Sequence, residues 1–166
     1  MKTTIIPSIF AKSKREFDDK LKIAVKLSSQ IQIDFMDGHF VRTKSIKLAD
    51  VPNLRNYENK FEAHLMSTHP ETWIKRLKNK GFEKIIFHYE SVREKEIPKM
   101  INEIHKLDME AFIAINPTTR EEKIFPFINE VDGFVILGVT PGGIYQKILR
   151  KTFYKIKNLR ERTSKP

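Results

Sequence analysis

The stretch IQIDFMDGHF, which begins at Ile31, places polar side chains inside an apolar run. Apolar residues alternate there with Gln32, Asp34 and Met36, a pattern typical of a β-strand. Because strand side chains have a period of two, these three side chains share one face of the strand. A carboxylate at the centre of so apolar a strand indicates either a hydrogen-bonded core residue or a group that does chemistry.

A second strand offers a partner for this carboxylate. The stretch FEAHLM places Glu62, His64 and Met66 on one face by the same rule. If the two strands are parallel neighbours, Asp34 and His64 can share a proton, a substrate oxygen or a metal ion such as Zn, Fe or Mn. The pair could also act as base and electrophile beside a carbonyl. Either residue alone is better explained as a satisfied core group, but together at adjacent strand ends they favour a functional site.

Short apolar runs alternate with amphipathic segments along the whole chain. The predicted strands are 4–9, 30–36, 61–66, 84–90, 110–116 and 133–139. The predicted helices are 14–28, 69–80, 94–106, 120–129 and 145–163, with a weaker one at 48–57. Ser13 and Thr68 are predicted to cap the first two of these helices, and Gly81 to follow the second. Strictly alternating strands and helices predict a parallel sheet with right-handed crossovers.

Polar residues at the strand ends help to decide between two folds with a parallel sheet, a barrel and an open doubly wound sheet. They fall near the carboxyl ends of successive predicted strands: Ser8, Asp34, His64, His88 and Asn116. In a (β/α)₈ barrel those ends meet at one mouth, whereas a doubly wound sheet calls for a Gly-rich turn after the first strand, which IIPSIFAKS lacks. We therefore expect an α/β fold of TIM-barrel type in one domain, residues 1–166. The barrel is incomplete, because about six βα units are present where eight close it.

Composition narrows the class of protein. The 166 residues are 40% hydrophobic and 31% charged and contain no cysteine, which predicts a globular fold without disulfides or thiolate metal sites. We expect no signal peptide and no membrane span, hence a cytoplasmic protein. The net charge is +10, and residues 147–166 carry eight Lys and Arg against one Glu. That basic end could bind nucleic acid, but its amphipathic pattern and lack of an RNA-binding motif favour a solvated helix face.

Five segments in order suggest a known family. IIPSIF, IDFMDGHFV, EAHLM, AINPTT and VTPGG resemble the ribulose-phosphate 3-epimerase family, over nearly the whole chain, and MDGHFV is the most specific of them. The resemblance implies a TIM barrel that interconverts D-ribulose 5-phosphate and D-xylulose 5-phosphate through an enediolate. It also implies two aspartates that transfer protons and a divalent metal ion held by two His and the same two Asp.

The family's functional residues carry over by position. The resemblance implies that Asp34 is the first catalytic aspartate and a metal ligand, and that His64 is a metal ligand near the substrate. Ser8 matches the serine that contacts substrate. Met36 and Met66 match the methionines that pack over the reactive carbon. An enediolate needs fixed positive charge in a dry pocket, which such residues can provide.

Two segments depart from the family pattern. Gln32 stands where the family has its first metal histidine, and an amide oxygen is a weaker ligand for Zn than an imidazole. The family's phosphate loop reads PGFGGQ, and this chain reads PGGIYQ. Gly142 and Gly143 are the expected phosphate-binding positions, while Ile144 and Tyr145 would hinder a phosphate from approaching the backbone.

The end of the sequence opens further alternatives. Leu137 stands where the family has a methionine, and Pro166 precedes the seventh strand, which in the family carries the second catalytic aspartate. We expect a pentulose-phosphate epimerase whose activity is impaired or is completed by a homo-oligomer. The alternatives are an inactive family member that binds a sugar phosphate or a protein partner, and a sibling enzyme acting on a hexulose 6-phosphate.

Overall fold

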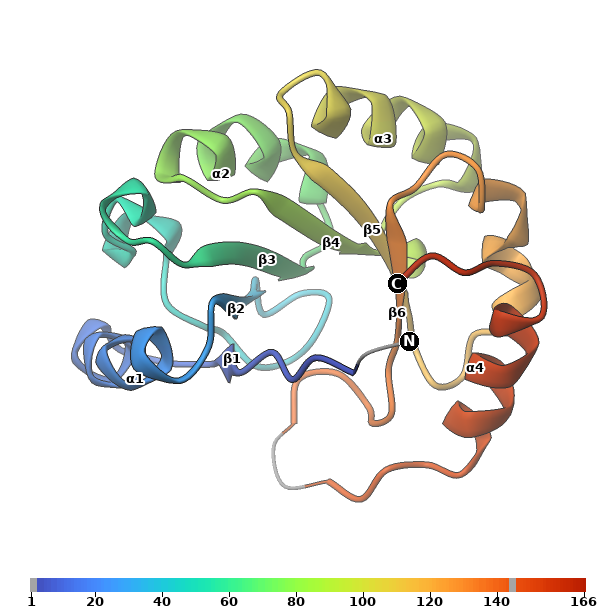
Figure 1. The fold of residues 1–166 in the computed structure, drawn as a ribbon, viewed down its shortest axis with the longest axis horizontal. Helices are drawn as coiled ribbons and strands as arrows, with labels where there is room; N and C mark the ends of the chain where they lie inside the picture. The colour runs from blue at the N-terminus through green and yellow to red at the C-terminus, as the bar shows by residue number, and fades with distance from the viewer. Residues whose placement is uncertain (1–2, 144–145) are drawn as a thin grey trace.

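The computed structural model describes residues 3–143 and 146–166, which form a curved parallel sheet with helices on its outer side (Figure 1). The strands pair in chain order: β1 (Ser8–Ile9), β2 (Gln30–Met36), β3 (Lys60–Met66), β4 (Lys84–His88), β5 (Glu110–Ile115) and β6 (Gly133–Ile136). The α-helices are α1 (Lys14–Leu27), α2 (Ile74–Lys80), α3 (Ile97–His105) and α4 (Lys151–Arg160). This confirms the predicted α/β fold of TIM-barrel type with six βα units.

The register of β2 against β3 is the one that the alternation pattern predicts. Asp34 lies opposite His64, and Met36 lies opposite Met66. The main hydrophobic core lies between the sheet and its helices. It includes Phe17 of α1 and Phe35, whose side chain lies on the face of β2 opposite to Asp34. The two faces of β2 therefore have different roles, because one packs against helices and the other lines the interior of the curved sheet.

Strand β1 is shorter than predicted. The strand was expected over 4–9, but only Ser8 and Ile9 pair with β2. Pro7 has no N–H to donate to a ladder, although its carbonyl oxygen still accepts from Gln32 N at 2.9 Å. A short pairing is nevertheless enough to place Ser8 beside β2.

Several predicted helices are partly or wholly 3-10 turns. These turns are Leu48–Asp50, Leu54–Asn56, Pro70–Trp73, Glu94–Glu96 and Glu121–Phe127. The prediction of an α-helix at 120–129 was wrong, and Pro126 supplies the reason, because it cannot donate the backbone hydrogen bond that an α-helix needs there. The predicted helix 145–163 begins only at Lys151, and its expected first residue lies outside the described residues.

Two of the three predicted cap residues are confirmed. Ser13 Oγ accepts from Glu16 N at 3.3 Å, and Gly81 adopts a left-handed φ of 97° after α2. The prediction for Thr68 was wrong. Its backbone N and its hydroxyl both donate to Asp37 Oδ2, at 2.7 and 2.9 Å, and the turn that follows begins without a side-chain cap.

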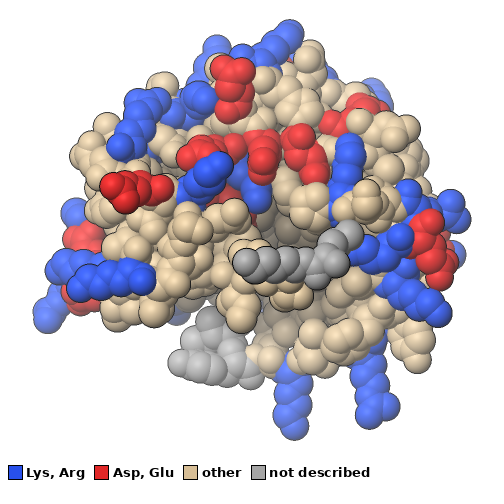
Figure 2. All heavy atoms as spheres, viewed as in Figure 1, with Lys and Arg blue, Asp and Glu red and all other residues tan. Residues whose placement is uncertain are grey.

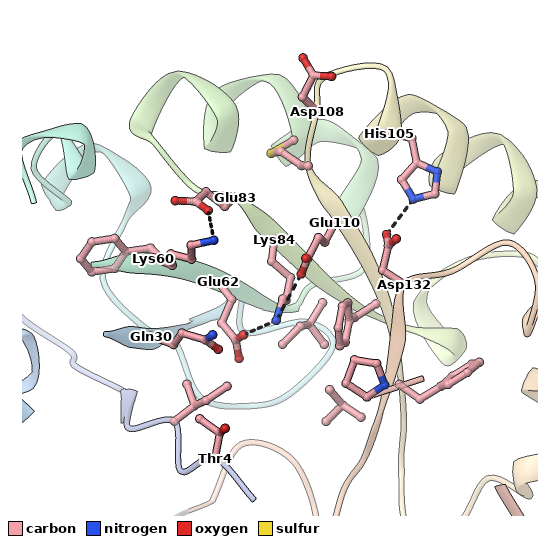
Figure 3. Close-up of a pocket in the computed structure, with 18 of the residues that line it drawn as sticks. Thr4, Gln30, Lys60, Glu62, Glu83, Lys84, His105, Asp108, Glu110 and Asp132 are labelled. Carbon is pink, nitrogen blue, oxygen red and sulfur yellow. Dashed lines mark hydrogen bonds and ion pairs between the residues drawn. The ribbon is translucent and has the colours of Figure 1, made fainter. Parts of the chain in front are cut away.

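The amino-terminal end of the sheet holds a cavity of about 1020 Å³ (Figure 3). Lys84 Nζ lies there 3.0 Å from Glu62 Oε2, 3.4 Å from Glu110 Oε2 and 4.3 Å from the centre of the Phe112 ring. On the face seen in Figure 2, acidic side chains gather over β3 to β5 and basic ones lie mostly around the rim. The polar strand-end residues of the sequence pattern lie at the opposite end of the sheet. Among the described residues, no helix is long and apolar enough to cross a membrane.

Candidate active site at the carboxyl ends of the strands

Asp34 is the centre of a buried hydrogen-bonded cluster. Its Oδ2 accepts from Ser8 Oγ at 3.0 Å, and its Oδ1 accepts from Gln32 Nε2 at 2.7 Å and lies 3.0 Å from His64 Nδ1. The side chain is only 12% exposed. Burial would raise the pKa of Asp34, but the hydrogen bonds from His64, Gln32 and Ser8 hold it below its usual value. The lowered pKa keeps the Asp34 carboxyl group ionised at neutral pH, which is the protonation state that a general base needs.

A chain of side chains extends from Asp34 into the interior. His64 Nε2 lies 2.9 Å from His88 Nε2, and the two rings meet edge to edge, with centres 5.1 Å apart and planes 19° from parallel. His88 Nδ1 in turn lies 3.3 Å from Glu90 Oε2. Burial lowers the pKa of His88, although Glu90 acts in the opposite direction. The sequence pattern placed His88 at the end of a strand but assigned it no role, and it did not single out Glu90. The spacing of the two residues in HYE (88–90) was the sequence signal that could have indicated their contact.

Asp37 organises the loop that follows β2. Its Oδ1 accepts from His39 N and Phe40 N, both at 2.8 Å, and its Oδ2 accepts the two Thr68 donors. Burial would raise the pKa of Asp37, but these backbone and hydroxyl donors lower it to about 2. Gly38 has a φ of 79°, and a side chain there would collide with Lys44. The motif MDGHF is thus explained as a tight loop that carries Phe40 to within 4.7 Å of the His88 ring.

A small apolar cluster lies beside Asp34 and its polar partners. Met36, Val41 and Met66 pack together and are at most 9% exposed, with Phe10 and Phe40 against them. The predicted position of the two methionines, beside Asp34 and His64, follows from the β2–β3 register. Apolar neighbours limit the contact of Asp34 with water and strengthen its electrostatic interactions, although Ser8 at the edge of the site is exposed. Contact with a substrate remains a prediction for both methionines.

The glycines after β6 lie beside the same mouth. Gly142 has a φ of 86°, its carbonyl oxygen accepts from Thr43 Oγ1 at 2.8 Å, and a Cβ there would lie 2.8 Å from Val41 Cβ. A glycine is therefore required by the close approach of the loop after β2. The expected hindrance by Ile144 and Tyr145 lies outside the described residues, and phosphate binding by Gly142 and Gly143 remains a prediction.

The donors at this site do not fit a divalent metal ion. Gln32 presents its NH₂ group to Asp34, because the reversed amide would place its oxygen against a carboxylate oxygen at 2.7 Å. His64 uses both ring nitrogens on protein partners. Within residues 3–143 and 146–166, no three His, Cys, Asp or Glu side chains are placed to hold a metal. The predicted metal ligands Asp34, His64 and Gln32 are thus brought together, but as a hydrogen-bonded cluster.

Comparison with known proteins identifies the class that this fold and site define. The chain belongs to the ribulose-phosphate 3 epimerase family, whose model matches residues 4–166. A ribulose-phosphate 3-epimerase of Schizosaccharomyces pombe is 29% identical over 163 residues, covering 95% of this chain and 71% of the relative. The cytoplasmic isoform of the enzyme from Oryza sativa subsp. japonica is 27% identical over 163 residues, covering 96% and 70%. That of Chlamydia pneumoniae is 31% identical over 130 residues, covering 78% and 56%.

Proposed function

We propose that this protein is an epimerase of pentulose 5-phosphates that interconverts D-ribulose 5-phosphate and D-xylulose 5-phosphate. The observation that carries the proposal is the carboxylate of Asp34, which is only 12% exposed and contacts three polar side chains beside an apolar cluster. The names of the relatives support the choice of substrate. The "cytoplasmic isoform" in the name of the rice relative supports a cytoplasmic location for this protein as well.

Asp34 supplies the proton transfer in this proposal. Its carboxylate removes the proton from the carbon next to the ketone, and the electron pair of that bond moves to the ketone oxygen to give an enediolate. The Ser8 hydroxyl, the Gln32 amide and the His64 ring lie around the carboxylate and fix its position. A proton from water, delivered to the opposite face of the same carbon, gives the epimer, and Asp34 then releases its proton to the solvent.

A second candidate function is binding of a sugar phosphate or a protein partner without catalysis. Gln32 favours it, because this residue replaces an imidazole of the family pattern and its NH₂ group occupies Asp34 Oδ1. Under this alternative the ligand stabilises the fold but its carbon-bound hydrogen does not exchange.

The experiment is NMR of D-ribulose 5-phosphate with the protein in deuterated water. We expect xylulose 5-phosphate to form with deuterium at the carbon next to the ketone. Asp34→Asn should reduce the rate about 10²- to 10⁴-fold, whereas Asp19→Asn, on the exposed side of α1, should match the wild type. A parallel run with a hexulose 6-phosphate tests the sibling activity.

Three results would contradict the proposal in different ways. If the folded protein gave neither deuterium exchange nor product, only binding without catalysis would be left as its function. Exchange without product would keep Asp34 as a base but exclude epimerisation. Product formation by Asp34→Asn at the wild-type rate would assign the proton transfer to another residue.

A further inference from the structure

We propose that Glu90 is a positioning residue, which fixes the His88 ring and through it the His64 ring beside Asp34. The expected effect on kcat rests on the proposed function, whereas the positioning of the two rings does not. Its geometric basis is the unbroken series of contacts from Glu90 Oε2 to His88, from His88 to His64 and from His64 to Asp34, at 3.3, 2.9 and 3.0 Å.

The two oxygens of Glu90 have separate partners. Oε2 faces His88 Nδ1, whereas Oε1 accepts from Asn116 N at 2.8 Å and from the Thr119 hydroxyl. The second set of contacts ties the end of β4 to the loop after β5. This loop is also held by Lys155, whose ammonium group donates to the Pro117 carbonyl oxygen at 2.9 Å. Because the loop has this independent anchor, the contact of Oε2 with His88 is not needed to hold it.

The orientation of His88 depends on a polar partner. Packing restrains the plane of the ring, since the Phe40 ring lies 4.7 Å from it, centre to centre, and the side chain is fully buried. Packing does not distinguish the ring from its half-turned form, which exchanges nitrogen and carbon positions. Glu90 makes the distinction, because a half turn would replace the nitrogen facing Oε2 by a carbon and also remove the nitrogen facing His64.

The placement of Glu90 fits this role. The side chain is 21% exposed, so it connects a fully buried imidazole to the edge of the site. A buried imidazole nitrogen without a hydrogen-bond partner destabilises the fold. The contact with Glu90 therefore favours the ring orientation in which His88 Nδ1 faces the carboxylate. The carboxylate accepts from Asn116 N and the Thr119 hydroxyl and contacts His88. Burial would raise the pKa of Glu90, but the His88 and Thr119 contacts keep it below its usual value.

Two variants separate the two oxygens. Glu90→Gln keeps the shape of the side chain and an acceptor for the loop, but it allows an NH₂ group to face His88 in place of an oxygen. Thr119→Val removes one loop donor to Oε1 and leaves the contact with His88 intact. The measurements are kcat and KM for D-ribulose 5-phosphate, the imidazole nitrogen NMR signals of His64 and His88, and the midpoint of urea unfolding.

For Glu90→Gln we expect a loss of up to about 100-fold in kcat, because the catalytic groups are misplaced, with KM nearly unchanged and with shifted nitrogen signals of both rings. For Thr119→Val we expect wild-type kinetics and signals. Unchanged ring signals in Glu90→Gln would overturn the inference, and so would equal losses in both variants. If the wild type has no activity, the proposed function fails, but the ring signals still decide the role of Glu90. Glu90→Asp, which withdraws the carboxylate by one methylene, gives the same readout if Glu90→Gln does not fold.

Discussion

Gln32 sets the chemistry of this site apart from that of the family pattern. It lies on the same face of β2 as Asp34 and contacts both Asp34 and His64, at 2.7 and 3.5 Å. An imidazole at this position would bring a third ligand to a carboxylate and a histidine that already meet, and three protein ligands are enough for a zinc site. One side chain therefore separates a hydrogen-bonded cluster from a candidate metal site.

The prediction that tests this point is Gln32→His. We expect the variant to retain about one equivalent of zinc after dialysis, by metal analysis, and the wild type to retain far less. Zinc at 100 times its dissociation constant should stabilise the variant by about 2.7 kcal/mol, and a chelator should remove that gain. Gln30→His is the control, since Gln30 shares the face of β2 but lies at the cavity end of the sheet. Equal zinc contents in the two variants would contradict the prediction.

Residue patterns in the sequence found part of the cluster and missed the rest for a geometric reason. Asp34 and His64 could be predicted, because they share a register position of adjacent parallel strands. His88 is not opposite His64, since the β3–β4 register places Ile86 there. The contact between the two histidines is diagonal and depends on the curvature of the sheet and on side-chain direction, which no periodicity encodes.

At the level of elements, the loop after β2 is held mainly by one carboxylate. Asp37 accepts hydrogen bonds from the loop itself and from Thr68 after β3, so it joins the ends of two neighbouring strands. The same loop positions Phe40 against His88 and Val41 in the apolar cluster. The element that identifies the family in the sequence is thus also the element that closes the site.

This anchor predicts a pH-dependent stability. The folded-state pKa of Asp37, about 2, is below its ordinary value of 3.8. Its contribution is therefore complete above about pH 5 and is lost as the pH falls through 3.8 towards 2. We expect Asp37→Asn to be less stable than the wild type by about 1–2 kcal/mol at pH 6, after allowance for solvent screening, and this gap to shrink by about half at pH 3.

Urea unfolding at the two pH values measures the effect. Asp19→Asn, on the exposed side of α1, removes a carboxylate without touching the loop and corrects for the change in net charge. A gap between Asp37→Asn and the wild type that stays constant from pH 6 to pH 3 would show that the Asp37 contacts do not depend on its charge.

The helical elements show where local sequence patterns stop being informative. Ser13 and Gly81 mark the ends of helices by local chemistry, and both were predicted. Thr68 has the same local signature as Ser13, but it is used by Asp37, a residue that is distant in the sequence. Around Pro126 the apolar spacing suits a helix, yet the missing N–H gives a 3-10 segment. Tertiary partners and single backbone donors therefore decide what hydrophobic periodicity leaves open.

Across the whole molecule, the two ends of the sheet carry different groups. The carboxyl end holds Asp34 and its partners, whereas the amino end holds the ion pair of Glu62 and Lys84 beside the cavity (Figure 3). The side chains of this pair are 8% and 17% exposed. In barrels of this type the carboxyl end of the sheet carries the chemistry, and the opposite end contributes stability. Substitutions at the two ends should therefore affect different measurements.

Lys84→Met tests this separation. The substitution leaves the Glu62 carboxylate without its cation in a largely buried place, so we expect a loss of about 2–4 kcal/mol in the free energy of unfolding, by urea titration. It should leave kcat for D-ribulose 5-phosphate within about twofold, because Lys84 lies at the end of the sheet opposite to the Asp34 cluster. Asp34→Asn, in contrast, should lower kcat about 10²- to 10⁴-fold. The double variant Glu62→Leu with Lys84→Met should recover most of the lost stability, since it removes the uncompensated charge. A double variant as unstable as Lys84→Met would assign the loss to the packing of the lysine chain on Phe112, and a parallel loss of kcat would show that the two ends of the sheet are coupled.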